Sequence, residues 1–414
     1  MGIGTAGGMC DRVGGVGVII AAALAGAAAA CGGGQTNSAP VVNVGDSAGV
    51  RLVRVPPLGS FSMPELDVVR LYSTADVGGA PLELFRVRDA LFLADGTLVL
   101  ANGGTEEIVF VDPAGRSHRR FGGKGQGPGE FNGLSRLLAR PGGGFLAWDY
   151  RLSRFDHEGA FIATLRLDPS SRVVSVAPLA VHDDGRIVAV LGEQRYFQRS
   201  GERRDTVPLM VYTPDRAQPD TVGTWPGLER AFGELRGSAT FIVPIGFART
   251  AFSASNGGRV AIGSSDSLDV TVFDADLKAV LRLVAPAAGR APTPAQQKAW
   301  REFALARLPM DDEQVRTAWS EAPIRGTFPG FDGLDVDPEG RLWLSEATVP
   351  GSARRRWVVF AADGTPLAEW EPLALWPSYL PGRTELLALG GDRVALLRRD
   401  QLDEESVEVW RINW

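Results

Sequence analysis

The chain has 414 residues, of which 44% are hydrophobic and 22% are charged, so it holds enough apolar side chains to bury a large core. Its formal net charge of −6 argues against a broad nucleic-acid surface, because such a surface needs an excess of cations to displace the counterions of the phosphates. The 51 glycines and 27 prolines predict frequent turns.

The N-terminus has the pattern of a secretory signal peptide. Arg12 precedes residues 16–30, VGVIIAAALAGAAAA, which are apolar and small, but fewer than the roughly 20 residues that a membrane span needs. The stretch ends in Ala-Ala-Ala before Cys31, which resembles the bacterial lipobox, where the cysteine thiol is acylated. We therefore expect a signal peptide with a lipobox at residues 1–31 and lipid attachment at Cys31. An ordinary cleavage site beside an unrelated cysteine is the alternative.

The cysteine count agrees with a lipid anchor. Cys10 and Cys31 are the only cysteines, so cleavage before Cys31 would leave one thiol for lipid and none for a disulfide. Because Gly32 rather than Asp follows the cysteine, we expect anchoring in the cell envelope, at the outer membrane or cell surface of a two-membrane bacterium. Residues 32–48 are mostly small and polar, which predicts a flexible tether to a single domain at 49–414.

A degenerate repeat dominates the rest of the chain. Its clearest copy, residues 91–121, alternates apolar strands with turns at 95–96 and 112–115. Asp-Gly between apolar runs is a strong hairpin signal, because glycine takes positive φ without steric strain. Five further copies occupy 137–165, 179–225, 251–283, 333–370 and 386–414. Six such units predict an all-β, six-bladed β-propeller of four-stranded antiparallel blades.

The last copy ends after its third strand, so a closed ring needs one strand from the N-terminal side. Two alternating segments qualify, 49–55 (GVRLVRV) and 67–72 (DVVRLY). We favour 67–72, because it precedes the first copy as each outer strand precedes the next unit. A closure of this kind removes exposed sheet edges.

One segment departs from the strand pattern. Residues 293–320 contain helix formers, a proline at the start and apolar side chains at helical spacing, so we expect one or two short helices in an insertion at about 290–322, between blades 4 and 5. The insertion would either cover apolar surface or gate the central channel.

Three segments resemble a known group of proteins. Residues 121–131, FGGKGQGPGEF, look like the G-x-G-x-G-P-G-E-F segment of bacterial six-bladed propellers related to NHL repeats. Residues 46–53 are similar to the start of that group after its lipobox, and residues 334–346 resemble its fifth-blade signature. The resemblance covers essentially the whole mature chain and implies a TolB-like propeller fold. It implies little about function, since propellers include both binders and enzymes.

Metal ligands are hard to find in the sequence. His118, His157 and His182 each fall in or beside a turn or outer strand, so we expect no ring of histidine ligands. Propellers of the lactonase type hold an axial calcium with carboxylate and amide oxygens. Weak candidates for such a calcium site lie in loops of one predicted face: Asn102, Glu106, Asp149, Asp266, Glu346 and Asp400. We expect no other cofactor.

The same predicted face collects arginine and aromatic residues, which are typical of binding interfaces. The candidates for ligand contact are Lys124, Gln126, Glu130, Arg136, Trp148, Tyr150, Arg151 and Arg154. For the turn at 127–131 we expect a structural role of Gly127, Pro128, Gly129 and Phe131, which leaves Lys124 and Glu130 free for a ligand.

Two classes of function stay open. The first is a membrane-anchored, monomeric binding or interaction module for a protein, peptide or glycan. The second is a calcium-dependent hydrolase of lactones or esters, with the metal in the central channel. The binding module is favoured because no catalytic constellation stands out, so the chain is not expected to be an enzyme. Neither class involves nucleic acid, and the membrane is contacted through the lipid only.

The lipid anchor makes the first testable prediction. A Cys31→Ser variant lacks the only thiol left after cleavage, so it should lose labelled fatty acid and accumulate as soluble or uncleaved protein. A Cys10→Ser variant, altered upstream of the cleavage point, should keep the label. Fatty acid retained on Cys31→Ser would contradict the lipobox.

Overall fold

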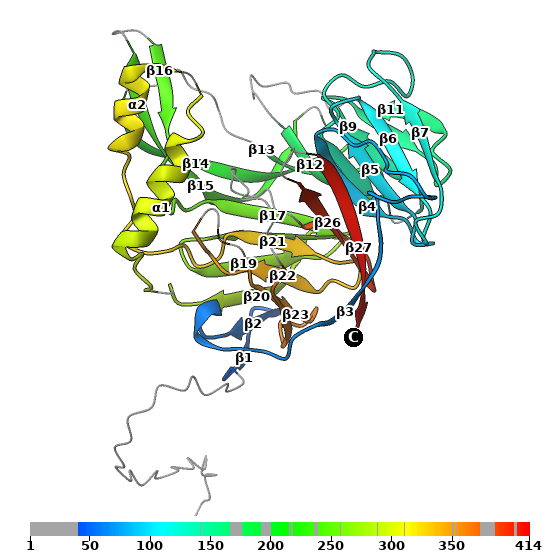
Figure 1. The fold of residues 1–414 in the computed structure, drawn as a ribbon. Coiled ribbons are helices and arrows are strands. Elements are labelled where there is room, and N and C mark those ends of the chain that lie inside the picture. The colour runs from blue at the N-terminus through cyan, green and yellow to red at the C-terminus, as the bar shows by residue number, and fades with distance from the viewer. Residues whose placement is uncertain are drawn as a thin grey trace, which may run out of the picture. The chain divides into compact units, whose positions relative to one another are not determined.

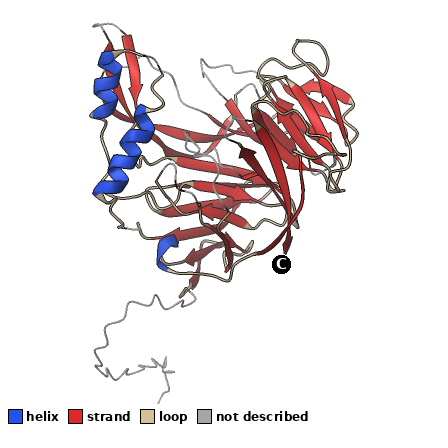
Figure 2. Cartoon of the chain, viewed as in Figure 1, coloured by secondary structure: helices blue, strands red, loops and turns tan. Residues whose placement is uncertain are grey.

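β-strands make up most of the regular secondary structure (Figure 2). The computed structural model describes residues 40–140, 142–165, 176–191, 200–214, 216, 218–235, 239–256, 258–287, 289–309, 311–349, 352, 354–372, 386–400 and 404–414, all within the unit Asn37–Trp414. The expected signal peptide and lipobox at residues 1–31 lie outside the described residues.

The strands form six sheets, which we number in chain order (Figure 1). Sheet 1 contains β4 (Val87–Phe92), β5 (Leu98–Asn102), β6 (Glu107–Val111) and β7 (His118–Gly122). Sheet 2 contains β8 (Arg136–Ala139), β9 (Phe145–Trp148), β10 (Leu152–Phe155) and β11 (Phe161–Leu165). Sheet 3 contains β12 (Val176–Val181), β13 (Ile187–Leu191), β14 (Gly201–Tyr212), β15 (Asp220–Leu235) and β16 (Ala239–Val243).

The other three sheets include strands from the N-terminal part of the chain. Sheet 4 contains β17 (Ala251–Asn256), β18 (Arg259–Ser264), β19 (Leu268–Phe273) and β20 (Ala279–Ala285), extended by β2 (Val50–Arg54) and β1 (Asn43–Ser47). Sheet 5 contains β21 (Gly333–Val336), β22 (Leu342–Ser345), β23 (Trp357–Phe360) and β24 (Pro366–Trp370). Sheet 6 contains β25 (Leu386–Leu389), β26 (Arg393–Arg399), β27 (Glu405–Asn413) and β3 (Asp67–Ser73).

The Asp-x-x-Gly turns close the hairpins as the sequence predicts. Asp156 accepts hydrogen bonds from the N–H groups of Glu158 and Ala160, and Gly159 takes a φ of 87°. Asp274 binds the backbone N–H groups of Asp276 and Lys278 in the same way, although Leu277 stands in the place of the glycine, with a φ of 59°. An aspartate that binds backbone N–H groups of its own turn fixes the hairpin without a metal.

Six hydrophobic clusters lie between successive sheets. Each cluster contains side chains of two sheets, in the order 1 and 2, 2 and 3, 3 and 4, 4 and 5, 5 and 6, and 6 and 1. The first strand of sheet 1, β4, contacts both β8 of sheet 2 and β25 of sheet 6. Because each sheet buries both faces against its neighbours, the architecture is that of a β-propeller.

Sheet 6 receives its fourth strand from residues 67–73, in agreement with the favoured sequence prediction. β3 pairs antiparallel with β27, so that Tyr72 lies opposite Val409, and the blue and red strands run side by side in Figure 1. The other candidate, 49–55, has a different partner. Its strand β2 pairs in parallel with β20 and so extends sheet 4.

The predicted tether at 32–48 is wrong from Asn43 onward. Residues 43–47 form β1, which makes a hairpin with β2. The turn is stabilised by Asp46, whose Oδ1 accepts a hydrogen bond from the N–H of Gly49, and Gly49 has a φ of 82°. The expectation of uniform four-stranded blades also needs correction, since sheet 3 has five strands and sheet 4 has six.

Between β2 and β3 the chain runs along sheet 5. The short 3₁₀ helix η1 (Leu58–Ser60) leads to Glu65, which forms an isolated parallel bridge with Glu369 of β24. The N–H of Leu66 donates to the carbonyl of Glu369 at 2.8 Å. Residues 43–73, which we call the N-terminal strap, therefore bind the outer strands of sheets 4, 5 and 6 in succession.

Two helices lie within the expected insertion, α1 (Pro294–Leu305) and α2 (Glu313–Ser320). Thr293 and Gln296 form a capping box at the start of α1. Trp300 and Trp319 are buried in a separate apolar cluster with residues of β15 and β16, and the Trp319 Nε1–H donates to the carbonyl of Ile242. The insertion thus covers apolar surface of sheet 3. Across the described ranges, no helix is long and apolar enough to span a membrane.

The seam between β3 and β27 can be tested with two substitutions on one strand. Tyr72 is 8% exposed and packs in the cluster between sheets 6 and 1, whereas Val69 is 45% exposed. Tyr72→Ala should lower the free energy of unfolding by about 3 kcal/mol, and Val69→Ala by less than about 0.5 kcal/mol. Urea unfolding measures both. Equal losses would mean that the seam does not support the ring.

Candidate functional site

Loops over sheets 1 and 2 contact one another and form a surface that we call the sheet 1–2 face, made of residues 85–86, 103–106, 123–135 and 149–151. Acidic side chains join these loops. Glu106 accepts hydrogen bonds from the N–H groups of Gly133 and Leu134, at 3.0 and 2.7 Å. Asp149 accepts one from the N–H of Asn132 at 3.0 Å. The loop that leaves sheet 1 is therefore held to both sheets.

Arg151 completes this framework. Its Nη2 donates to Asp149 at 2.7 Å and to the carbonyl of Glu130 at 2.8 Å, while Nη1 donates to the carbonyl of Gln126 at 2.9 Å. The hydrogen bond that Arg151 donates to Asp149 raises the pKa of Arg151. Such charge-assisted bonds are short and strong, so Arg151 and Asp149 serve as internal supports.

Glu130 is also an internal support, which corrects the expectation that it is free for a ligand. Its carboxylate accepts a hydrogen bond from the N–H of Gly127 at 2.8 Å. Phe131 is fully buried between sheets 1 and 2, and Gly129 has a φ of 78°, which favours glycine. The burial of Phe131 and the positive φ of Gly129 agree with the structural role expected for Gly127, Pro128, Gly129 and Phe131.

Two aromatic rings on this face stay in water. Tyr150 is 78% exposed and Phe85 is 54% exposed. Each ring lies over a glycine: a Cβ on Gly104 would come within 2.2 Å of the Phe85 ring, and one on Gly133 within 3.1 Å of the Tyr150 ring. The glycines therefore leave room for the rings to lie flat on the loops.

Cations and strained backbone surround the rings. The Arg86 guanidinium lies 5.0 Å from the Phe85 ring centroid, and the side chains of Lys124 and Gln126 are exposed. Arg86, Glu106 and Tyr150 have φ values of 54°, 61° and 75°, in the left-handed region that disfavours side chains. Backbone strain of this kind concentrates at functional sites. Sequence analysis missed Phe85 and Arg86, because they precede the first recognised repeat.

Three predicted ligand contacts lie in strands rather than loops. Arg136 opens β8, where its Nη1 donates to the carbonyl of Pro178 at 2.9 Å. Trp148 ends β9 and packs partly buried against the cluster between sheets 2 and 3. Arg154 lies inside β10 and is half-buried. These three residues belong to the sheet and not to its loops, because β8, β9 and β10 extend further than the sequence pattern indicated.

The weak calcium candidates are engaged in separate contacts. Asn102 Oδ1 accepts from the N–H of Phe85 at 2.7 Å, Asp266 binds Arg204 at 2.8 Å, and Glu346 pairs with Arg356 at 3.3 Å. Asp400 accepts from the N–H of Glu404 at 2.9 Å. Within the described part of the chain, no three acidic, histidine or cysteine residues are grouped to hold a metal. Glu106 and Asp149, the other two candidates, both lie on the sheet 1–2 face, where each binds backbone N–H groups.

The innermost strands carry charges that sequence analysis did not select. Asp89 on β4 accepts a hydrogen bond from the N–H of Leu137 at 2.8 Å. Burial raises the pKa of Asp89 to about 6, against the opposing effect of Arg136. Burial also raises the pKa of Asp335, on β21, to about 7, and the charge of Asp89 adds to this rise. The sequence signal that could have identified Asp89 and Asp335 is that each is the only acidic residue of its short strand.

Comparisons with known proteins extend the description only a little. No protein-family model and no curated protein matches the chain. Solved structures with a similar fold include a member of the DUF4221 family from Bacteroides vulgatus, with 10% identity, a TM-score of 0.46 and coverage of 85% of this chain and 99% of that one. A gluconolactonase from Xanthomonas campestris shows 14% identity, a TM-score of 0.39 and coverage of 85% and 97%. Virginiamycin B lyase from Staphylococcus aureus shows 9% identity, a TM-score of 0.33 and coverage of 80% and 83%. Likeness at this level carries no argument about activity.

The raised pKa of Asp335 makes a prediction about pH. Because its folded pKa exceeds that of an unfolded aspartate, near 4, its contribution to stability is full below pH 4 and is lost as the pH rises through about 7. Asp335→Asn should remove this loss and raise the free energy of unfolding at pH 8, relative to the parent, by about 1–3 kcal/mol.

Asp363→Asn is the control of opposite sign. The N–H of Thr365 lowers the pKa of Asp363, so its contribution is present at neutral pH and lost in acid. Its asparagine variant should therefore lose stability at pH 8. Urea titrations between about pH 2 and pH 8 measure both. Parallel pH profiles for the parent and Asp335→Asn would contradict the assignment.

Proposed function

We propose that this chain is an extracytoplasmic binding module: a six-bladed propeller, closed by β3, that is lipid-anchored through Cys31 and binds a protein, peptide or glycan on its sheet 1–2 face. The six shared clusters between consecutive sheets support the blade count and the closure. The signal peptide, the lipobox and the ligand contacts rest on the sequence pattern and on the surface described above.

The observation that carries the proposal is the pair of exposed rings. The rings of Phe85 and Tyr150 remain exposed to water, although burial of either ring would stabilise the fold. Tyr150 and Arg86, the neighbour of Phe85, both have a backbone φ in the left-handed region. Exposed aromatic residues beside arginine are typical centres of binding energy.

The charge of the face favours an acidic ligand. Glu106 and Glu130 accept backbone N–H groups and Asp149 binds Arg151, so at least one carboxylate oxygen of each is engaged within the loops. Arg86 and Lys124 are exposed on the same surface. A ligand with flat apolar groups and acidic groups would match both features, because opposite charges steer association and rings stack on apolar faces.

A hydrolase is the second candidate, and Asp335 is the observation that favours it. A carboxyl group whose pKa is raised to about 7 suits general acid–base catalysis near neutral pH. The charge of Asp89 raises the pKa of Asp335 further, and the charge of Arg136 lowers it. This hydrolase would act from the innermost strands, far in sequence from the exposed rings.

The test uses arrays of acidic peptides and glycans probed with the purified domain. Tyr150→Asn and Phe85→Ala should each weaken binding at least tenfold, because removal of a central aromatic contact costs about 2 kcal/mol or more. Stability should stay equal or rise in Tyr150→Asn, since asparagine tolerates positive φ. Ile162→Ala, on the outer strand β11 with 47% exposure, is the control and should bind normally.

Two results would count against a binding module on this face. Binding that survives Tyr150→Asn and Phe85→Ala would place the ligand elsewhere. Turnover of a lactone or ester that is abolished by Asp335→Asn and unaffected by Tyr150→Asn would favour the hydrolase instead.

A further inference from the structure

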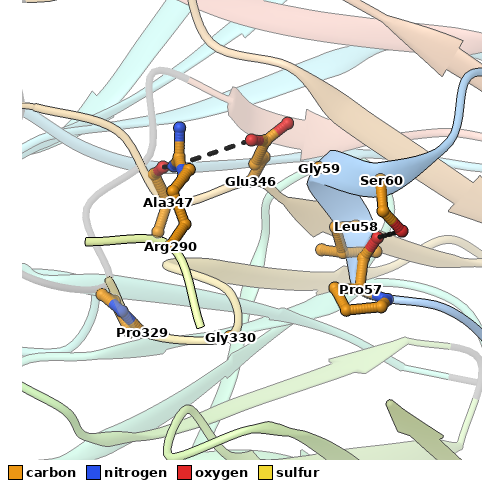
Figure 3. A pocket seen from close by; sticks show the side chains of 9 residues that line it. All are labelled: Pro57, Leu58, Gly59, Ser60, Arg290, Pro329, Gly330, Glu346 and Ala347. Atoms are coloured by element: carbon orange, nitrogen blue, oxygen red, sulfur yellow. Dashed lines mark hydrogen bonds and ion pairs between the residues drawn. The ribbon is translucent and has the colours of Figure 1, made fainter. Parts of the chain in front are cut away.

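A small cleft lies away from the sheet 1–2 face, where three separate segments of the chain meet (Figure 3). The N-terminal strap contributes residues 57–60, the connection around the helical insertion contributes Arg290 and residues 329–330, and the β22–β23 loop contributes Glu346 and Ala347. Its volume is about 100 Å³, which is the space of roughly three water molecules. The cleft can therefore take a ligand of only a few heavy atoms.

Arg290 is held in place within this cleft. Its guanidinium lies 4.1 Å from the centroid of the Phe328 ring, and its Nη2 donates a hydrogen bond to the carbonyl of Ala347. The carbonyl of Arg290 accepts from the N–H of Phe328 at 2.9 Å, so backbone and side chain are both fixed. Stacking on a ring orients the planar guanidinium while leaving its edge free for an acceptor.

The hydrogen-bonding capacity of Arg290 is largely unused. Its contact with Glu346 is 3.6 Å long, which is an ion pair without a hydrogen bond. The bond to Ala347 is the only hydrogen bond that its guanidinium makes to the residues that the structure describes. The neighbouring Arg356 differs, since its guanidinium donates to Glu369, Glu346 and two carbonyls of the strap.

Glu346 also keeps an oxygen available. Its Oε2 faces Arg356 at 3.3 Å, whereas Oε1 lies toward Arg290 and against Gly59, where a Cβ would come within 2.6 Å of it. Among the described residues Oε1 accepts no hydrogen bond. Arg290 and Glu346 thus present a donor edge and an acceptor atom to the same cleft, as the sticks of Figure 3 show.

The local charges balance before any ligand enters. Arg290 and Arg356 carry two positive charges, and Glu346 and Glu369 carry two negative ones. A ligand with a net charge would leave one charge uncompensated in a partly desolvated cleft, which is unfavourable. A zwitterion adds one charge of each sign and keeps the balance.

We propose that this cleft binds a small α-amino acid, with its carboxylate on Arg290 and its ammonium group on Glu346 Oε1. The carboxylate takes the free edge of the guanidinium, the arrangement in which arginine binds carboxylates best. Pro57, Pro329 and Ala347 line the cleft with apolar surface for a side chain no larger than a methyl group. Alanine and glycine fit these limits.

Ligand binding at this site would also hold the strap. Leu58, Gly59 and Ser60 form one wall, so the cleft exists only while the strap is bound to the ring. An amino acid that bridges Arg290 and Glu346 therefore stabilises the docked strap by mass action.

The experiment titrates the purified protein with L-alanine by calorimetry, beside propionate, which has only the carboxylate, and propylamine, which has only the ammonium group. We expect L-alanine to bind at least tenfold more tightly than either. Arg290→Gln and Glu346→Gln should each weaken alanine binding at least tenfold. Arg354→Gln is the control, because Arg354 is 58% exposed on the same loop and does not line the cleft.

Limited proteolysis between residues 57 and 63 gives a second readout, which should slow in the presence of L-alanine and not of propylamine. The proposal is overturned if alanine fails to bind, if propionate binds as tightly as alanine, or if Arg290→Gln binds alanine like the parent while keeping its melting temperature. Phe85→Ala and Tyr150→Asn should leave alanine binding unchanged, so failure here is distinguishable from failure of the proposed function.

Discussion

The pairing of β3 with β27 is the interaction on which the rest of the structure depends. It joins residues separated by more than three hundred positions, for example Asp67 and Asn413, whose side chains are hydrogen-bonded at 2.8 Å. Thr74 adds a buried hydrogen bond by accepting from the N–H of Val407 at 2.7 Å. The entropy lost on closing so long a loop grows only with the logarithm of its length. The apolar cluster between sheets 6 and 1, which includes Tyr72, supplies the compensating burial.

The rest of the strap binds the outer strands of sheets 4 and 5. Arg356 is central to it, because its guanidinium donates to the carbonyls of Leu58 and Phe61 and binds Glu369 at 2.6 Å. Glu369 in turn accepts from the N–H of Met63 at 2.8 Å. Arg356 is half-buried and donates both to acidic side chains and to carbonyls of the strap. These bonds hold residues 58–61 of the strap to sheet 5, although this segment lies outside the repeats.

The turns could be predicted from the sequence, whereas the pairings between distant strands could be predicted only in part. The turns rich in aspartate and glycine and the fourth strand of sheet 6 were predicted, because side-chain chemistry and strand order determine them. The strand β1 was missed, because Asn-Val-Gly-Asp-Ser has the composition of a linker and becomes a strand only through its pairing with β2. At the site, the exposure of Lys124 and Tyr150 followed from their loops. The bond of Glu130 to Gly127 is local, but composition alone does not indicate which loop carboxylate turns back onto its own backbone. The burial of Asp89 and Asp335 did not follow from the sequence, since it depends on neighbouring strands distant in the chain.

Glu106 and Tyr150, on the sheet 1–2 face, both have a backbone φ in the left-handed region. At Glu106 the strained backbone is offset locally, because its carboxylate binds two N–H groups of the neighbouring loop. At Tyr150 the compensation comes from the neighbouring residues, because the N–H of Asp149 donates to the carbonyl of Arg151 and the N–H of Arg151 donates to Asp149 Oδ1, both at 3.1 Å, while the ring itself is 78% exposed. A residue in this conformation costs about 1–2 kcal/mol relative to glycine. The turn bonds of Asp149 and Arg151 offset that cost, so the feature of Tyr150 that the fold does not account for is the exposure of its ring.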